Sequence, residues 1–261
     1  MNVVVLIKRV PDTETRIQIK DGKVVTDGIS WIISPYDEYG VEEALRLIEK
    51  YTGKVTLLCL GPDEAKETIR KGLALGADEA VHLNDPAFLG GDASTTAKVL
   101  AAALKKMSYD LILTGKQAVD EDNAQVGVRV AELLGLPDVN SVIKIELSED
   151  HKSARCTREV DGDRDIMETS LPAVITTQQG LNEPRYPSLK GIMGAKKKPI
   201  KDWKASDIGI DPTTVGAKGA KLEVINIEPP PARPSGKIIP GDAATAAKEL
   251  VRLLHEEAKV V

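Results

Sequence analysis

The chain has 261 residues, with 35 Lys and Arg against 40 Asp and Glu and a formal net charge of −5. This length suits one large domain or one domain with an appendage, because domains usually span about 100–200 residues. The hydrophobic fraction of 42% and the charged fraction of 29% exclude a disordered chain. The acidic balance and the aromatic fraction of 3% argue against a nucleic-acid partner, which requires a basic surface or aromatic stacking platforms.

Three further features of the sequence indicate the cellular compartment of the protein. No apolar run approaches the roughly 20 residues of a membrane span, so stable membrane insertion is not expected. The apolar segment 3–7 precedes Lys8 and Arg9, which reverses the order of a secretory signal. Cys59 and Cys156 provide no disulfide framework. We therefore expect a cytoplasmic protein.

Short apolar runs alternate with helical patterns along the first 180 residues. The apolar runs predict strands at 3–7, 55–60, 80–83, 111–114 and 173–177, and Asp21-Gly22 predicts a hairpin turn. Helices are predicted from Ser34 to about Ile48, after Pro62 to about Gly76, from Asp92 to Met107, and from about Asp122 to Leu134. This alternation predicts an α/β fold, a doubly wound and mostly parallel sheet with helices on both faces. The pattern of 142–166 predicts a small antiparallel excursion.

The hydrophobic periodicity and the proline content of the chain change after Gly180. Residues 181–240 have little periodicity and many prolines, and the segment is too long for an ordinary loop in a compact domain. We therefore predict three parts: an α/β domain over 1–180, an extended C-terminal arm over 181–240 that packs on another chain, and a helix over 241–261.

The carboxyl ends of the strands are where a doubly wound sheet binds ligands. Small or polar residues follow three of them: Ser34 lies beyond the hairpin after the first strand, Leu60-Gly61 follows the second strand, and Thr114-Gly115 follows the fourth. In the stretch 115–127 the glycine permits close approach of a ligand, a lysine and a glutamine offer polar contacts, and the next helix begins with free N–H groups suited to a phosphate. An ordinary strand–loop–helix turn with acidic caps explains the same residues, and the spacing alone favours it.

The segment 90–96, Gly-Gly-Asp-Ala-Ser-Thr-Thr, is a second candidate. Glycines followed by hydroxyl groups at a helix start can hold a pyrophosphate through backbone N–H and side-chain donors. A capped helix without a ligand is an equally good interpretation.

The chain offers little for catalysis by its own side chains. His82, His151 and His255 lie far apart and have no metal-ligand spacing, so no metal site is expected. No Ser–His–Asp or paired-carboxylate arrangement can be argued, and no catalytic residue is predicted. Redox chemistry would therefore have to come from a cofactor. The lysine-rich stretch 190–204 is either a solvated charge run or a docking surface.

The segment 181–198, Leu-Asn-Glu-Pro-Arg-Tyr-Pro-Ser-Leu-Lys-Gly-Ile-Met-Gly-Ala-Lys-Lys-Lys, resembles the signature loop of the electron transfer flavoprotein beta subunit family. Similar matches run through the chain at 5–10, 25–28, 35–45, 67–70 with 76–78, and 115–118 with Gln125. The resemblance implies a heterodimer with an alpha subunit that carries electrons between acyl-CoA or related dehydrogenases and an acceptor. It also implies one FAD held mainly by the alpha subunit and contacted by this chain.

The resemblance places a nucleotide site on Leu6, Ser34, Leu60 and 115–127, and a partner-recognition loop on 181–198 with Leu189 as its apolar anchor. With the strand ends and helix starts above, the predicted cofactor-binding residues are Leu6, Lys8, Ser34, Leu60, Gly61, Asp92, Ser94, Thr95, Thr96, Gly115, Lys116, Gln117, Ala118, Asp120, Asp122, Asn123, Ala124, Gln125, Val126 and Gly127. The predicted partner-binding residues are Leu181, Asn182, Glu183, Pro184, Arg185, Tyr186, Leu189, Ile192 and Met193.

Two branches of the family differ in the nucleotide that the beta subunit holds. One branch holds AMP as a structural ligand, and the other holds a second FAD, oxidises NADH and bifurcates electrons. The segment 88–96, the stretch 115–127 and the C-terminal residues 249–260 resemble the second branch. Glu121 replaces a glycine of that branch and adds a negative charge where a pyrophosphate would lie, and Asn123 replaces a threonine.

A nucleotide-sensing adaptor of the same sheet architecture is the alternative from another functional class. Such a protein would have no use for the segment 181–240. The arm therefore favours the electron carrier.

Overall fold

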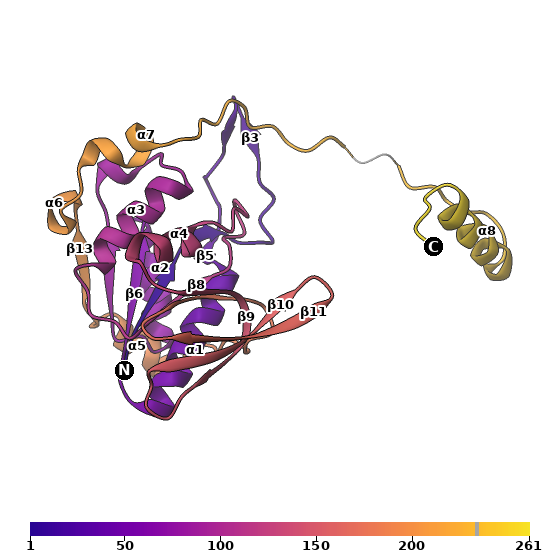
Figure 1. Ribbon diagram of the computed structural model, residues 1–261. Coiled ribbons are helices and arrows are strands. Elements are labelled where there is room, and N and C mark those ends of the chain that lie inside the picture. The colour runs from indigo at the N-terminus through magenta and orange to yellow at the C-terminus, as the bar shows by residue number, and fades with distance from the viewer. Residues whose placement is uncertain (233–234) are drawn as a thin grey trace. The chain divides into compact units, whose positions relative to one another are not determined.

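The computed structural model describes residues 1–232 and 235–261 (Figure 1). The chain forms two compact units, one made of 1–17 with 26–225 and the other of 18–25 with 226–261. Among the described residues, no helix has the length and apolar character needed to cross a bilayer.

A nine-stranded sheet forms the centre of the larger unit. Its strands are β1 (Asn2–Ile7), β6 (Lys54–Leu60), β7 (Glu79–Leu83), β8 (Leu111–Gly115), β9 (Asp138–Leu147), β10 (Ser153–Val160), β11 (Asp163–Ser170), β12 (Val174–Thr177) and β13 (Ile200–Trp203). They lie in the order β11-β10-β9-β12-β8-β1-β6-β7-β13. Along this order, every neighbouring pair in the run β9-β12-β8-β1-β6-β7-β13 is parallel. The two strands at the other edge, β10 and β11, pair antiparallel. The predicted mostly parallel sheet with an antiparallel excursion is confirmed.

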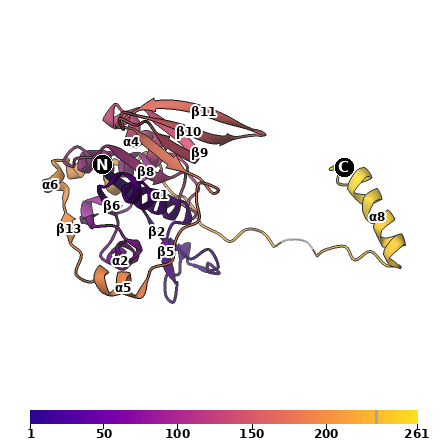
Figure 2. The same cartoon turned by 90° about the horizontal axis from the view of Figure 1, so that it is seen from below.

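Helices cover both faces of the sheet (Figure 2). One face packs against α1 (Pro35–Tyr51), α2 (Ala65–Leu75) and α5 (Leu189–Ala195), and the other against α3 (Ala93–Leu104), α4 (Val126–Leu134) and α6 (Ala205–Ile208). Successive residues of β1 point to opposite faces, so Val3 and Val5 join the first core and Val4 and Leu6 the second. Because β1 is buried on both sides, its sequence is continuously apolar.

Shorter elements complete the two units. In the larger unit, β2 (Arg9–Pro11) pairs with β5 (Trp31–Ile33), and η1 (Pro86–Phe88), η2 (Pro212–Thr214) and α7 (Gly216–Gly219) are single turns. In the smaller unit, β3 (Ile19–Lys20) and β4 (Lys23–Val24) form the predicted hairpin, with positive φ angles at Asp21 and Gly22 in its turn. The predicted C-terminal helix is α8 (Ala243–Glu256), and the Asp242 side chain caps it by accepting the Thr245 N–H.

Residues 181–225 of the predicted arm belong to the larger unit, so this part of the arm packs against its own chain. Within this segment α5 packs beside α2, and β13 extends the sheet by pairing with β7. Lys198 donates from Nζ to the carbonyls of Leu73, Gly76 and Ala77, which end α2. The two glycines of α5 and the four-residue length of β13 hid these elements from pattern analysis. Arg233 and Pro234 of the predicted arm lie outside the described residues.

The start of α4 also differs from the prediction. The helix was expected from about Asp122, but it begins at Val126. Asp122 and Ala124 both have φ of 50°, in the left-handed region that a right-handed helix excludes. The preceding loop is therefore four residues longer than the sequence pattern indicated.

The buried carboxylate of Asp37 ties α1 to the sheet. Its Oδ2 accepts the Lys8 N–H at 2.7 Å and its Oδ1 accepts the Gly115 N–H at 2.9 Å, just after β1 and at the end of β8. A Cβ at Gly115 would lie 2.4 Å from the Asp37 Oδ1, so only glycine allows this approach. Thr177 of β12 adds a hydrogen bond to the Tyr36 carbonyl. The first turn of α1 thus holds three adjacent strand ends together.

Removing the Asp37 carboxylate should destabilise the fold. Two backbone N–H groups lose their acceptors in Asp37→Ala, and each such loss costs about 1–3 kcal/mol, so the free energy of unfolding should fall by about 2–6 kcal/mol. Chemical denaturation measures this. Asp110→Ala is the matched control, because Asp110 accepts the Asn2 N–H at an exposed position. Equal losses in the two variants would contradict the assigned role.

Stability should also depend on pH through Asp37. Burial raises the pKa of Asp37 to about 7, against an unfolded value of about 3.9. The folded state therefore binds this proton more tightly, and its contribution to stability is complete below pH 4 and is lost as the pH rises to about 7. We expect the free energy of unfolding to fall between about pH 4 and pH 7, and to fall less steeply in Asp37→Asn. Burial also raises the pKa of Glu38 and Glu43, so the slope should shrink rather than vanish. Identical slopes would refute the assignment.

Candidate functional site

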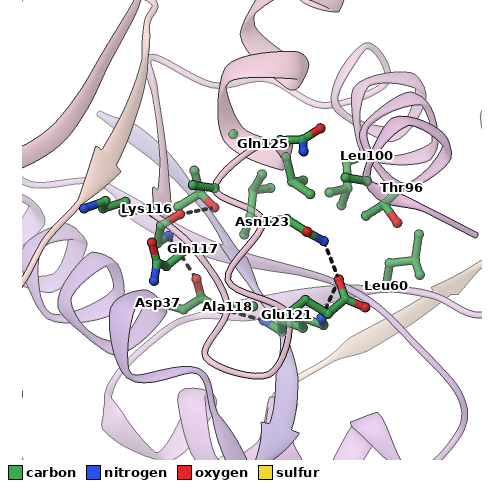
Figure 3. A pocket seen from close by; sticks show the side chains of 18 of the residues that line it. Asp37, Leu60, Thr96, Leu100, Lys116, Gln117, Ala118, Glu121, Asn123 and Gln125 are labelled. Carbon is green, nitrogen blue, oxygen red and sulfur yellow. Dashed lines mark hydrogen bonds and ion pairs between the residues drawn. The ribbon is translucent and has the colours of Figure 1, made fainter. Parts of the chain in front are cut away.

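A cavity of about 180 Å³ opens at the carboxyl ends of β1 and β8. The chain leaves β1 toward β6 on one side and places β8 on the other, so this position is the switch point of the sheet. Figure 3 shows Lys116 on one side of the cavity and Leu60 and Thr96 on the other. The cavity therefore joins residues from both halves of the sheet.

Most of the predicted cofactor-binding residues line this cavity. Those that do are Leu6, Lys8, Leu60, Asp92, Thr96, Gly115, Lys116, Gln117, Ala118, Asn123, Ala124, Gln125, Val126 and Gly127. Those that do not are Ser34, Gly61, Ser94, Thr95, Asp120 and Asp122. The first set brings together segments that lie more than a hundred residues apart in the chain.

The loop from β8 delivers the N-terminus of α4 to the cavity. Val126 and Gly127 belong to the first turn of this helix, where N–H groups have no partner within the helix and carry partial positive charge. A Cβ on Gly127 would lie 2.8 Å from the Thr114 Cγ2 and 2.9 Å from the Thr176 Cγ2. Glycine at this position therefore lets the helix start lie directly against the strand ends. The arrangement suits an anion.

The N-terminus of α3 is occupied by the protein itself. Asp92 accepts the Thr95 N–H at 2.8 Å, and the Thr95 hydroxyl accepts the Asp92 N–H at 2.9 Å in a capping box. Asp92 Oδ2 also accepts the Lys221 N–H at 2.6 Å. Burial opposes ionisation of Asp92, but these N–H groups outweigh it and lower its pKa to about 2. Of the three predicted hydroxyl donors, only Thr96 lines the cavity, and Ser94 lies on another surface beside Arg129.

Lys8 offsets the acidic residues of the loop. Its Nζ lies 2.9 Å from the Asp120 Oδ1 and 3.4 Å from the Glu121 Oε2. Glu121 also accepts a hydrogen bond from Asn123, which replaces the threonine expected from the resemblance (Figure 3). The extra negative charge of Glu121 is therefore partly neutralised at the rim of the cavity.

Sequence reasoning missed several residues of the cavity wall. They are Ile7, Asp37, Gly91, Ala93, Leu100, Thr114 and Glu121, the last noted only as a departure from the family pattern. Asp37 looked like an ordinary acidic residue in the first turn of a helix. No sequence signal set it apart, because its partners Lys8 and Gly115 lie 29 and 78 residues away in the chain. Ser34, which was predicted, is fully buried and its Oγ has no hydrogen-bond partner among the described residues.

His82 of β7 and Gly61, which follows β6, have a structural role. His82 is fully buried, with Nδ1 2.9 Å from the Asp202 Oδ1 and Nε2 3.0 Å from the Gly61 carbonyl oxygen. This links β13 to the end of β6 and engages the Gly61 carbonyl. In the described part of the chain, no cluster of three or more His, Cys, Asp or Glu could hold a metal ion.

The predicted partner-binding residues divide into two groups. Residues 181–185 are partly buried or bonded to α1: Asn182 donates to the Tyr39 carbonyl, and Arg185 donates to Glu42. The apolar side chains that follow are exposed instead, with exposed fractions of 95% for Tyr186, 76% for Leu189, 47% for Ile192 and 66% for Met193. We call these four side chains the apolar loop surface. Such a concentration of exposed apolar side chains is typical of a docking site.

Comparison with known proteins agrees with this architecture. Residues 21–208 match the electron transfer flavoprotein domain. The chain is 44% identical to the electron transfer flavoprotein subunit beta of Bacillus subtilis, with 100% of both chains covered. It is 40% identical to the electron transfer flavoprotein subunit beta of Bos taurus, covering 90% of this chain and 91% of the relative. It is 38% identical to the caffeyl-CoA reductase-Etf complex subunit CarD of Acetobacterium woodii, covering 98% and 99%. The chain belongs to the electron transfer flavoprotein beta subunit family.

Proposed function

We propose that this chain pairs with an electron transfer flavoprotein alpha subunit and carries electrons between acyl-CoA-type or related dehydrogenases and an acceptor. The observation that carries the proposal is the cavity at the switch point, where a helix N-terminus and two lysines surround a space bounded by apolar residues. The flavin would supply the electron chemistry, and this chain would bind, orient and dock. Its two cysteines are free and buried, which suits a reducing, cytoplasmic setting.

An adenine nucleotide fits the donor set of the cavity. The N–H groups that open α4, together with Lys8 and Lys116, suit a phosphate. Leu60 and Leu100 provide apolar walls for a flat ring. A shared FAD would lie mainly on the alpha subunit and contact this chain.

We propose that the occupant of the cavity is a second FAD. Gly91, Asp92 and Thr96, from the segment that resembles the bifurcating branch, line the cavity together with the start of α4. A site that extends from α4 to α3 supports a ligand longer than one phosphate. On this basis we also propose NADH oxidation and electron bifurcation.

AMP is the second candidate, in a carrier that does not bifurcate. The carboxylate of Asp92 sits on the N-terminus of α3, and the Thr95 hydroxyl is engaged in the capping box. These contacts leave fewer donors for a pyrophosphate than the sequence suggested.

Two exposed apolar surfaces support the proposed binding of a dehydrogenase and of an alpha subunit. The apolar loop surface suits a dehydrogenase, and the name of one relative places that relative in a complex with a caffeyl-CoA reductase. Leu222, Val224 and Ile225 have exposed fractions of 71%, 74% and 94%, which supports coverage by an alpha subunit. A nucleotide-sensing adaptor would need neither surface.

Nucleotide content tests the proposed second flavin. The heterodimer purified with its alpha subunit should release two FAD on denaturation, measured by chromatography of the supernatant. Thr96→Val should weaken retention of the second FAD about five- to tenfold, because one hydrogen bond of about 1 kcal/mol is lost. Ser94→Ala is the matched control, since Ser94 lies outside the cavity. Release of one FAD and one AMP would replace this proposal with the structural-AMP carrier.

The Leu189→Ala variant tests the proposed docking of a dehydrogenase on the apolar loop surface. Full burial of a leucine against a partner contributes about 1.5–3 kcal/mol, so Leu189→Ala should weaken docking to a dehydrogenase about 10- to 100-fold. Flavin content should stay unchanged, because Leu189 is exposed and does not line the cavity. Steady-state reduction of the heterodimer by butyryl-CoA dehydrogenase measures the effect. Leu133→Ala, at an exposed leucine of α4, is the control. Equal KM values for the two variants would sink the docking proposal.

A further inference from the structure

The apolar loop surface follows directly from a segment that is bonded along α1. The Asn182 side chain donates to the Tyr39 carbonyl and to Glu43, each at 3.0 Å. One turn further on, Arg46 donates to the Glu183 carbonyl at 3.3 Å. These contacts lay the backbone of 182–185 along one face of the helix. The exposed side chains begin at the next residue, Tyr186.

Arg185 makes the densest of these contacts. Its Nε donates to the Glu42 Oε2 at 2.7 Å and its Nη2 to the Glu42 Oε1 at 3.2 Å, while its backbone N–H also donates to Glu42. Its Nη1 and Nη2 donate to the two carboxylate oxygens of Glu49. The guanidinium therefore spans two carboxylates on one face of α1, which the planar fork of arginine allows and an ammonium does not.

Glu42 gives this cluster its rigidity. Its side chain is only 4% exposed and also accepts the Arg46 Nε at 2.6 Å. Burial alone would raise the pKa of Glu42, but the hydrogen bonds from Arg185 and Arg46 outweigh it and lower the pKa. Loss of Arg185 would leave a buried carboxylate with Arg46 as its remaining charged partner, which is costly.

The far end of the apolar loop surface is fixed as well. Arg70 of α2 donates to the carbonyls of Ala195 and Lys198, each at 2.6 Å. Gly191 packs so closely on α2 that a Cβ there would lie 2.3 Å from the Ala74 carbonyl oxygen. Tyr186 therefore follows a fixed point on α1, whereas Leu189, Ile192 and Met193 lie on α5, which is held against α2 at Gly191 and Ala195.

We propose that Arg185 is a positioning residue, which holds the apolar loop surface in its docking geometry by bridging Glu42 and Glu49. The inference rests on the docking role proposed for Leu189. A surface that is ordered before docking loses less conformational entropy when a dehydrogenase binds. Arg185 would thus favour docking because it keeps the loop ordered, and it would contact neither flavin nor substrate.

The test uses the heterodimer with its alpha subunit. Arg185→Gln should speed amide hydrogen exchange of residues 186–193 at least tenfold and raise the KM for the heterodimer in the butyryl-CoA dehydrogenase assay about five- to tenfold, with kcat and flavin content unchanged. Arg185→Lys should restore part of the effect, since one ammonium can satisfy one of the two carboxylates. The matched charge control is Lys144→Gln, whose Lys144–Glu146 ion pair is exposed on β9.

Glu42→Gln keeps the arginine and removes the buried charge, so it should also speed exchange of 186–193 even if Arg185→Gln folds poorly. Exchange that stays at the wild-type rate in a folded Arg185 or Glu42 variant would overturn the positioning role. So would a raised KM without faster exchange. If Leu189→Ala leaves KM unchanged, the docking role itself fails, whatever the exchange rates show.

Discussion

The hydrogen bonds that the Asp37 carboxylate accepts hold the cavity end of the sheet together. The carboxylate is buried at the point where β1 and β8 end, and it accepts one backbone N–H from each side. Those strand ends would otherwise carry unpaired donors inside the protein, which costs more than a typical hydrogen bond contributes. The same contact requires glycine at 115 and so sets the path of the loop that surrounds the cavity.

Helix α1 connects the cavity with the segment that precedes the apolar loop surface. Its first turn carries Asp37 at the cavity, and one face of its later turns carries Glu42 and Glu49, which bind Arg185. A single rigid helix therefore fixes the position of both. The proposed nucleotide site and the proposed docking surface would therefore share one rigid support.

Much of the fold could be predicted because it follows from periodicity. The buried strands of the parallel sheet are continuously apolar, and caps such as Asp92 and Asp242 mark helix starts. The pattern failed where tertiary contacts override local preference. The left-handed residues Asp122 and Ala124 delay α4, and a four-residue edge strand, β13, depends on pairing with β7.

The site was predictable to a similar degree. Glycines and lysines at strand ends pointed to the cavity, because parallel strands bring their carboxyl ends together. The capped start of α3 was one of two interpretations that the sequence left open, whereas the burial of Asp37 could not be predicted, since it depends on distances that sequence spacing does not contain. The contacts that Arg185 and Lys198 make within the chain were equally hidden, because their hydrogen-bond partners lie more than a hundred residues away.

A crystal structure of the purified heterodimer would show directly whether the cavity binds a nucleotide. We expect one between β1, β8 and α4, with a phosphate oxygen within hydrogen-bond distance of the N–H of Val126 or Gly127. A cavity filled by water alone, with every bound nucleotide held by the alpha subunit, would contradict this expectation.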